Sequence, residues 1–383
     1  MLSQNTHIQA LLGLVPKLTE DCIHPEYWSA ALCRQVISLQ GDIPLRDSRP
    51  INPQIAGTAK SGRTEKTREF SVSRADAGYL GRFHAQKYAA LPDVDLVCVV
   101  DSDPDRAAAM GAELGVPHTT SLDDLPGRVD LASVATPTVT HHAVTLPLLA
   151  AGIHVLVEKP ITSTETEARE LLQAAEKAGV LLQVGHLERF NPAVQTLREE
   201  VRRPLFVEAH RLSRFSGRAT DVDIVRDLMI HDLDILLSLV KAPLVEIRAT
   251  GVPVVTPNVD LANARLSFAD GCTANLTASR LSFKDMRRFR VIHTRGYVVA
   301  DCASRQNQIF RKPAGAQDLA LPQEVEHGPA DNLLAEIRSF VRAIRQQQPA
   351  AVSGLDGLNA LQLALKINQT IAEEMEKHAQ AKG

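Results

Sequence analysis

Short apolar runs alternate with helical patterns between residues 71 and 190, and this alternation constrains the fold more than any other feature of the sequence. The apolar runs suit strands buried on both faces, and they are "DLVCVVD" (95–101), "VDLASVATP" (129–137), "IHVLVEKP" (153–160) and "VLLQVGH" (180–186). The last helical pattern among them opens at Ser163, a good N-cap, followed by Glu165 and Glu167 in its first turn. Because strands joined by helices of this length lie parallel with right-handed crossovers, we expect an α/β domain with a Rossmann-type parallel sheet.

The pattern changes after about residue 204. Strand-like segments follow one another across short turns, of which "ADG" (269–271) is a credible hairpin turn. One helical stretch, "RDLMIHDLDILLSLV" (226–240), interrupts them, and two helical patterns end the chain. We therefore expect an α+β domain with a large, mostly antiparallel sheet, and terminal helices that pack back on the domains.

The expected domain boundaries follow from these changes in pattern. Residues before 71 contain one amphipathic stretch, 8–18, and then a segment rich in Pro, Gly, Ser and Arg, which predicts a largely flexible extension. The expected units are an amino-terminal extension (1–70), a dinucleotide-binding domain (71–190), a substrate-binding domain (191–330) and carboxy-terminal helices (331–383).

Composition excludes several classes of function. The chain has 383 residues with a net charge of −3 and a pI of about 6.5, so no bulk attraction to nucleic acid or to an anionic membrane is expected. Five scattered cysteines without a C-x-x-C pair indicate reduced thiols and argue against a structural zinc site. No segment approaches the roughly 18 apolar residues that span a bilayer. We expect a cytoplasmic protein.

The segment "RADAGYLGRFHAQ" (74–86) resembles a phosphate-binding turn. Two glycines, Gly78 and Gly81, allow the backbone to approach a pyrophosphate, and a helix that starts near Tyr79 directs free N–H groups at it. Asp101 follows Gly81 by twenty residues, where a carboxylate accepts hydrogen bonds from a ribose and disfavours a 2'-phosphate. We expect a cofactor loop at Gly78, Tyr79, Leu80 and Gly81, with NAD favoured over NADP. The alternative is an ordinary helix start, with Asp101 capping a turn.

Asp76 and Arg74 depart from this motif. A side chain at the first glycine position restricts the tight turn, and an anion near a pyrophosphate is repulsive. An arginine at the end of a central parallel strand is costly to bury. Three alternatives remain open: cofactor binding is weakened, these side chains point away from the ligand, or the segment before Ala77 is not native to this fold.

Two further stretches carry chemistry. Lys159 leaves a buried strand just before a proline, beside Glu158, and a desolvated lysine there can relay a hydroxyl proton. Asp227 and His231 are four residues apart and share a helix face, so the carboxylate can orient the imidazole and raise its basicity. The alternatives are a solvated strand-end lysine and a polar helix face. A metal site is disfavoured because the sequence shows no second ligand cluster of matching spacing.

The segment "QVGHLERFNPA" (183–193) follows a strand at the expected domain junction, where substrate contacts collect. His186, Arg189 and Asn191 are therefore candidate substrate-binding residues. The alternative is ordinary polarity of a linker.

Taken together, "AGYLGRFHA", the acid of "VVDSDP", "ATPTVTHH", "GIHVLVEKPI" and "DLMIHDLD" resemble the glucose-fructose oxidoreductase/inositol dehydrogenase/MocA family over about residues 77 to 372. The resemblance implies that Lys159, Asp227 and His231 form the catalytic group. It also implies NAD(P) binding, with four residues lining the nicotinamide side, namely Thr136, Pro137, His141 and Glu158.

Within that family, residues 183–193 and 226–235 look most like bacterial dehydrogenases that oxidise UDP-N-acetylglucosamine to its 3-keto form for 3-amino sugar and lipid A biosynthesis. The expected reaction is hydride transfer from a ring hydroxyl of a sugar or sugar nucleotide, with Arg189 or Arg211 meeting a diphosphate. We expect a homodimer or homotetramer, because an open sheet face seeks a partner. Two alternatives remain: an inositol or free-sugar dehydrogenase of the same family, and a non-catalytic relative with an impaired cofactor loop.

Overall fold

The computed structural model describes residues 67–73, 78–215, 222–312 and 321–381. Arg74, Asp76 and nearly all of the expected amino-terminal extension lie outside these residues, and so does the amphipathic stretch 8–18. None of the described helices is long and apolar enough to cross a membrane.

The first sheet is parallel and has six strands in the order β3-β2-β1-β4-β5-β6. Its strands are β1 (Thr67–Ser73), β2 (Val94–Val100), β3 (His118–Thr119), β4 (Leu131–Ala135), β5 (His154–Glu158) and β6 (Leu182–Gly185). This is the expected Rossmann-type sheet. Strand β1 begins at Thr67, so the expected domain boundary at residue 70 falls inside it; the segment lacks the continuous apolar run that identified the other central strands.

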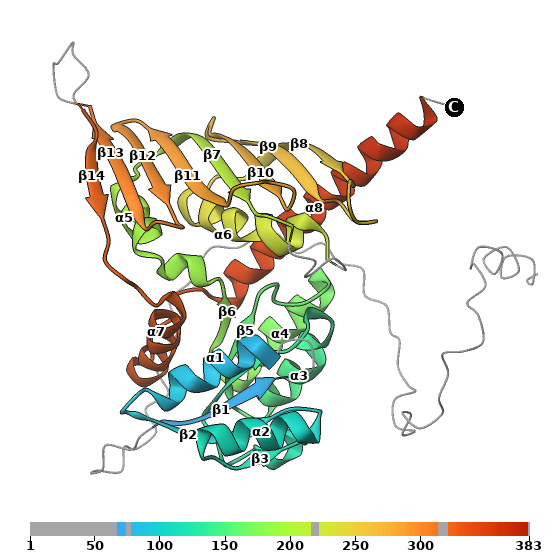
Figure 1. The fold of residues 1–383 in the computed structure, drawn as a ribbon, viewed down its shortest axis with the longest axis vertical. Helices are drawn as coiled ribbons and strands as arrows, with labels where there is room; N and C mark the ends of the chain where they lie inside the picture. Colours follow the sequence, from blue (N-terminus) through green and yellow to red (C-terminus); the bar gives the residue numbers. More distant parts are fainter. Residues whose placement is uncertain (1–66, 74–77, 216–221, 313–320, 382–383) are drawn as a thin grey trace, which may run out of the picture. The chain divides into compact units, whose positions relative to one another are not determined.

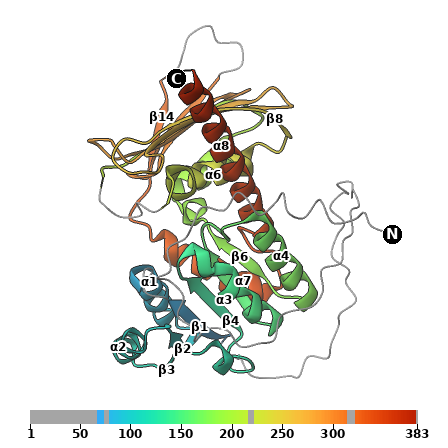
Figure 2. The same ribbon diagram turned by 90° about the vertical axis from the view of Figure 1, so that its right-hand side faces the viewer.

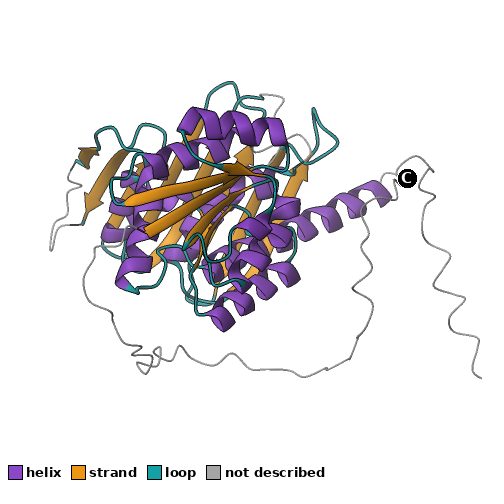
Figure 3. Cartoon of the chain, turned by 90° about the horizontal axis from the view of Figure 1, so that it is seen from below, coloured by secondary structure: helices purple, strands orange, loops and turns teal. Residues whose placement is uncertain are grey.

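Helices cover both faces of this sheet (Figure 1, Figure 3). On one face, α1 (Gly78–Ala89) and α7 (Asn332–Gln346) share a core with Leu131 and Leu156. On the other, α3 (Thr138–Ala150), α4 (Glu165–Ala178) and α8 (Gly354–Gln380) pack on the opposite side chains of β4 and β5. The helix α2 (Pro104–Leu114) packs beside α1 and β2. Alternation of side chains along buried strands supplies both cores.

The helix that we expected to open at Ser163 starts one residue later. Thr164 is the N-cap, and its hydroxyl accepts a hydrogen bond from Glu167 N while the Glu167 carboxylate accepts one from Thr164 N. This reciprocal capping box satisfies two backbone donors. An N-cap at Ser163 could not form it, because the residue three positions later is Thr166 and not an acid.

The second sheet has eight strands in the order β14-β13-β12-β11-β7-β10-β9-β8. All its pairs are antiparallel except β7 with β10, as expected for a mostly antiparallel sheet. Its strands are β7 (Pro204–Leu212), β8 (Leu244–Val252), β9 (Leu261–Phe268), β10 (Thr273–Ser279), β11 (Met286–His293), β12 (Gly296–Asp301), β13 (Gln306–Arg311) and β14 (Gln323–Glu326). The turn at 269–271 joins β9 to β10, with Gly271 at a φ of 86°.

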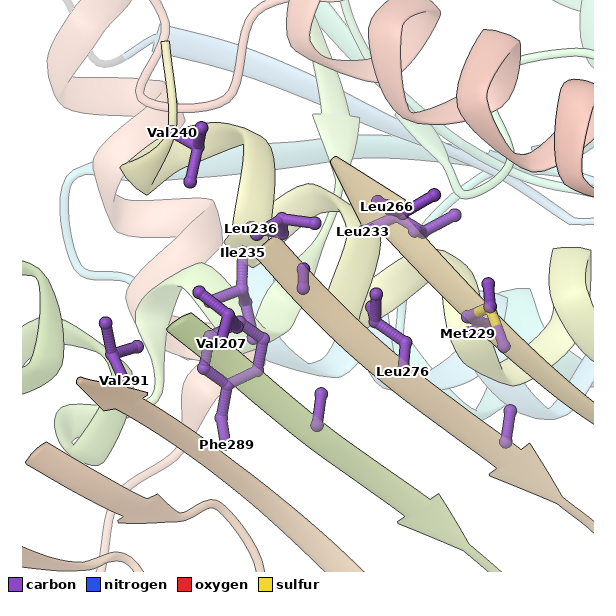
Figure 4. Close-up of a cluster of buried hydrophobic side chains, with 14 of the residues drawn as sticks. Val207, Met229, Leu233, Ile235, Leu236, Val240, Leu266, Leu276, Phe289 and Val291 are labelled. Carbon is purple, nitrogen blue, oxygen red and sulfur yellow. The ribbon is translucent and has the colours of Figure 1, made fainter. Parts of the chain in front are cut away.

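One face of this sheet is covered by α5 (Pro192–Glu200), α6 (Ile230–Leu239) and part of α8. Figure 4 shows this core, in which Leu233, Ile235 and Leu236 of α6 pack over Leu276 and Phe289 of the strands. The packing fixes α6, and with it the residue His231, against the sheet.

The long helix α8 contributes to both cores (Figure 2). Near its start Gly357 lies against Val184 of β6, and a Cβ on this glycine would come within 2.5 Å of Val184 Cγ2. Further along, Ile367 and Ile371 belong to the core beneath the second sheet. Since one rigid helix packs on both sheets, the end of β6 and the helix α6 are held in a fixed relation.

Candidate active site

The carboxyl ends of the parallel strands bring together most of the residues predicted from the sequence. Strands β1 and β4 are neighbours, and the chain leaves them toward opposite edges of the sheet. A ligand site is expected at such a switch point. Thr136 follows β4, Lys159 follows β5 and His186 follows β6.

The turn predicted to bind a dinucleotide coincides with the start of α1. Gly78 is the first residue of the helix, and Tyr79, Leu80 and Gly81 complete its first turn. The helix therefore presents free N–H groups at the carboxyl end of β1, which suits a pyrophosphate.

Asp101 lies at the end of β2, as predicted, but its carboxylate is paired. It receives hydrogen bonds from Arg106 Nε at 3.1 Å and Nη2 at 2.9 Å, and from Asp103 N at 2.9 Å. The partly exposed guanidinium beside it neutralises the charge that was expected to repel a 2'-phosphate. The electrostatic argument for NAD over NADP is therefore weaker than the sequence suggested.

His141 supports the site instead of facing a ligand. Its Nδ1 lies 2.8 Å from the carbonyl oxygen of Pro160, and its Nε2 lies 2.8 Å from that of Thr136. Burial lowers the pKa of His141 despite these carbonyls, so the ring is neutral and donates to one oxygen at a time. The contacts hold the residue after β4 close to the cis Lys159–Pro160 segment after β5. The buried Thr136 hydroxyl has no hydrogen-bond partner among the described residues.

Glu158 links α1 to the segment that carries Lys159. Its Oε1 lies 3.0 Å from His84 Nε2 on α1, and its Oε2 accepts a hydrogen bond from Lys159 N at 3.2 Å. Burial acts to raise the pKa of Glu158, but the hydrogen bond and charge of His84 and the charge of Lys159 hold that pKa below its ordinary value. Gly185 on β6 makes room for this carboxylate, because a Cβ there would lie 2.8 Å from its oxygens.

Two buried polar side chains near Glu158 escaped the sequence analysis. Glu336 on α7 is fully buried, and both its oxygens lack hydrogen-bond partners among the described residues. Gln183 on β6 is likewise buried with both amide atoms unpaired in this part of the chain. Burial and the charges of Glu158 and Asp234 raise the pKa of Glu336 well above its ordinary value. The sequence did contain a signal for Glu336, because this acid lies on the apolar face of the helical pattern "ADNLLAEIRSFV".

Lys159 reaches across to the turn that carries Asp227. Its Nζ donates to the backbone oxygen of Asp227 at 2.8 Å and lies 3.4 Å from the carboxylate Oδ1. Asp227 belongs to a single π-helical turn, Val225–Met229, just before α6. Such turns are frequent at functional sites. The structure thus brings Lys159 and Asp227 together as the resemblance implied.

His231 follows on α6, but its environment differs from the one expected. Asp227 bonds to Lys159, and His231 Nδ1 is buried without a hydrogen-bond partner among the described residues. Burial, and then the charges of Lys159, Arg211, His186 and Arg287, lower the pKa of His231 well below its ordinary value. The expected rise in basicity is therefore wrong, because burial first and then the positive charges near the ring lower the pKa of His231.

His186 lies against His231, with ring centroids 6.4 Å apart and planes at 88°. It is buried, neither of its ring nitrogens has a hydrogen-bond partner among the described residues, and burial lowers its pKa. Of the predicted substrate residues, His186 is the one whose polar atoms have no partner within the described part of the chain, and it lies next to His231.

The other three predicted substrate residues are already paired. Arg189 binds Asp234 through two bonds of 2.6 and 2.7 Å. Arg211 binds Asp232 at 2.8 and 3.1 Å and Glu188 at 3.0 Å. Asn191 caps α5 and donates to Glu188 and to the Cys302 carbonyl. The expectation that Arg189 or Arg211 meets a diphosphate is contradicted, because buried carboxylates occupy both guanidinium groups.

Comparison with known proteins agrees with this architecture. Residues 77–186 match the oxidoreductase family with an NAD-binding Rossmann fold, and residues 193–299 match the GFO/IDH/MocA C-terminal domain. UDP-N-acetylglucosamine 3-dehydrogenase of Acidithiobacillus ferrooxidans is 39% identical over 299 residues, which are 77% of this chain and 95% of the relative. Its solved structure matches with a TM-score of 0.74 at 37% identity, over 80% of this chain and 97% of that one. Myo-inositol 2-dehydrogenase of Thermotoga maritima is 25% identical over 319 residues, which are 78% and 95% of the two chains.

A Rossmann-type domain is joined to a mostly antiparallel sheet, and α6 with the turn before it carries Asp227 and His231, of which Asp227 contacts Lys159 after β5. This architecture is that of an oxidoreductase. The chain belongs to the Gfo/Idh/MocA family, as the sequence motifs implied. It is a dehydrogenase with a nicotinamide dinucleotide fold, in a family that acts on sugars and related polyols.

The raised pKa of Glu336 predicts a pH dependence of stability. The unfolded chain releases this proton near the ordinary pKa of 4.5 whereas the folded chain retains it, so stability contributed by the neutral acid falls as the pH rises above that value. Glu336→Gln removes this loss. We expect its melting temperature to match that of the wild type near pH 4.5 and to exceed it near pH 8, by about 1–2 °C for each kcal/mol of stability in a protein of this size.

Thermal unfolding across that pH range measures the effect. The control is Glu376→Gln, at an exposed position on α8. A difference between Glu336→Gln and wild type that does not grow with pH would show that Glu336 ionises normally in the folded protein.

Proposed function

We propose that this chain is an NAD-dependent dehydrogenase that oxidises a ring hydroxyl of a UDP-sugar, with UDP-N-acetylglucosamine oxidised to its 3-keto form. The observation that carries the proposal is the contact of Lys159 Nζ with Asp227, beside His231 and His186. The substrate class is supported by the 39% identity to UDP-N-acetylglucosamine 3-dehydrogenase along 95% of that relative. A 3-keto product is the precursor that a transamination to a 3-amino sugar requires, as in lipid A biosynthesis.

The residues present suit a nicotinamide dinucleotide. The first turn of α1 offers backbone N–H groups for the pyrophosphate. The buried hydroxyl of Thr136, which has no partner among the residues that the structure describes, lies at the carboxyl end of the adjacent strand β4 and offers a polar partner there. Bound NAD supplies the hydride acceptor. NAD remains our preferred cofactor over NADP because a carboxylate, that of Asp101, stands at the end of β2, where it can accept hydrogen bonds from a ribose.

Each member of the catalytic group has a role that its surroundings support. Asp227 positions Lys159 through its backbone oxygen and carboxylate. The Lys159 ammonium stabilises negative charge on the substrate oxygen as its proton leaves. His231 accepts that proton, since its lowered pKa keeps the imidazole neutral and ready. The electrostatic cost of charging His231 between cations is reduced because the substrate oxygen carries the opposite charge.

We also propose that the reaction takes place in the cytoplasm and that the enzyme is a homodimer or homotetramer. The first rests on the free state of Cys98, Cys272 and Cys302. The second rests on the face of the eight-stranded sheet opposite α6, where Tyr297 and Phe310 stack with centroids 5.3 Å apart and Arg290 lies over Tyr297.

The function is tested by following NAD reduction with UDP-N-acetylglucosamine, N-acetylglucosamine and myo-inositol as substrates. We expect turnover with the UDP-sugar, and a fall in kcat/KM of about 10²- to 10⁴-fold in Lys159→Met and in His231→Asn, with NAD affinity little changed. The control Lys366→Met, at an exposed site on α8, should retain full activity. Turnover of myo-inositol alone would establish the inositol alternative, and no turnover of any substrate would favour a non-catalytic relative.

The pH profile tests the role of His231. The group must be neutral to accept a proton, and burial together with Lys159, Arg211, His186 and Arg287 lowers its pKa well below 6.5. We therefore expect kcat/KM at saturating NAD to stay constant as the pH falls to about 6.5 and to decline only at more acid values. A decline that begins above pH 6.5 would assign the proton acceptor to another group.

A further inference from the structure

A basic and aromatic surface lies at the carboxyl end of β7 and the amino end of β11. It consists of Arg214, Phe215, Phe283, Lys284 and Arg287, all exposed, and we call it the β7–β11 corner. Phe283 is 94% exposed and Phe215 46%. Single apolar side chains at a surface need no explanation, but two phenylalanines among three cations are typical of a binding surface.

Hydrogen bonds define the shape of this corner. Ser213 N donates to Ser279 O at 2.8 Å, and Ser282 N donates to Ser213 O at 3.0 Å. Arg214 N donates to Asp285 Oδ1 at 3.1 Å, and Arg214 Nε donates to Phe283 O at 2.9 Å. The chain after β7 and the chain before β11 are thus tied to each other, which holds the backbone of Phe283 beside Arg214.

Arg287 links the corner to the catalytic group. On β11 it shares a sheet face with Phe289, which packs in the core with α6, and it pairs in register with Arg211 of β7. Arg287 is one of the cations that act on His231. Its guanidinium therefore lies on the side of the sheet where hydride transfer is proposed.

The guanidinium of Arg287 is available to a ligand, in contrast to those of Arg189 and Arg211. Its side chain is 55% exposed, and its ion-pair contact among the described residues is Glu188 Oε1 at 3.8 Å. That oxygen already accepts a hydrogen bond from Arg211 at 3.0 Å. A free, forked donor beside a catalytic site suits a phosphate group.

We propose that the β7–β11 corner binds the nucleoside diphosphate part of the substrate, with Arg287 on the diphosphate and Phe283 stacked on the base. The inference rests on the proposed function, because it assumes that the oxidised sugar carries a nucleotide. Three cations against the single acid Asp285 give the corner a positive charge that a diphosphate neutralises. An exposed phenylalanine ring offers a face on which a pyrimidine stacks.

The test is a calorimetric titration of UDP into the full chain with NAD present, which measures the affinity for UDP. We expect Arg287→Ala to weaken UDP binding by at least about tenfold, and Phe283→Ala to weaken it by about fivefold or more. Arg287→Lys should show an intermediate loss, since it keeps the charge without the fork. The matched control is Arg288→Ala, because Arg288 is exposed on the same strand but faces the opposite side of the sheet; its affinity should stay within about twofold of wild type.

Steady-state kinetics separate this inference from the proposed function. In Arg287→Ala we expect the KM for UDP-N-acetylglucosamine to rise about tenfold with kcat little changed. If the wild type oxidises the UDP-sugar but Arg287→Ala and Phe283→Ala leave UDP affinity and KM unchanged, the corner is not the nucleotide site and the proposed function stands. A change of oligomeric state in Phe283→Ala without loss of UDP binding would assign the corner to contact with a second copy. No UDP binding and no turnover by the wild type would overturn both proposals.

Discussion

Two buried arginine–aspartate pairs hold the helix that carries His231, and the geometry of the site depends on them. Arg189, just after β6, is bonded through both its Nε and Nη2 to Asp234, while Arg211 of β7 binds Asp232 in the same way. Both acids belong to α6, so one helix is locked to the end of the parallel sheet and to the open sheet together. Removal of one partner from such a pair leaves a buried, unpaired charge and lowers the free energy of unfolding by about 3–5 kcal/mol. By fixing α6, the two pairs also fix the position of His231, which lies on the same helix.

The placement of α6 also explains the electrostatics of the site. Burial lowers the pKa of both His186 and His231, and the charge of Lys159 adds to this effect at both rings, joined by Arg189 at His186 and by Arg211 and Arg287 at His231. Behind Lys159, the hydrogen bond and charge of His84 on α1 hold the pKa of Glu158 below its ordinary value despite burial, whereas burial raises the pKa of Glu336 well above its ordinary value. A neutral proton acceptor in a positive field favours a substrate oxygen that is losing its proton, and the same field favours a phosphorylated substrate.

Much of the fold could be predicted because buried strands and amphipathic helices leave strong periodic signals. Apolar runs predicted the strands β2, β4, β5 and β6 and placed Lys159 at a strand end. The parallel order of the strands then predicted that their carboxyl ends lie together. Strand β1 was less evident, since "TREFSVS" opens with three polar residues and has only two apolar ones. The pairing of Arg189, Arg211 and Asp101 could not be predicted, because their partners are either distant in the sequence or chosen by packing. For the same reason the four-residue spacing predicted that Asp227 would orient His231, whereas in the structure Asp227 contacts Lys159.

The central claim is that the turn at the start of α1 binds a nicotinamide dinucleotide even though Asp76 replaces the first glycine of the motif. Calorimetric titration of NAD into the full chain, with an Asp76→Gly variant alongside, tests it most directly. The account predicts saturable binding by the natural chain in the micromolar range, with the variant binding as tightly or more tightly because it lacks the anion. Absence of saturable binding by the natural chain, whether or not the variant binds, would contradict it.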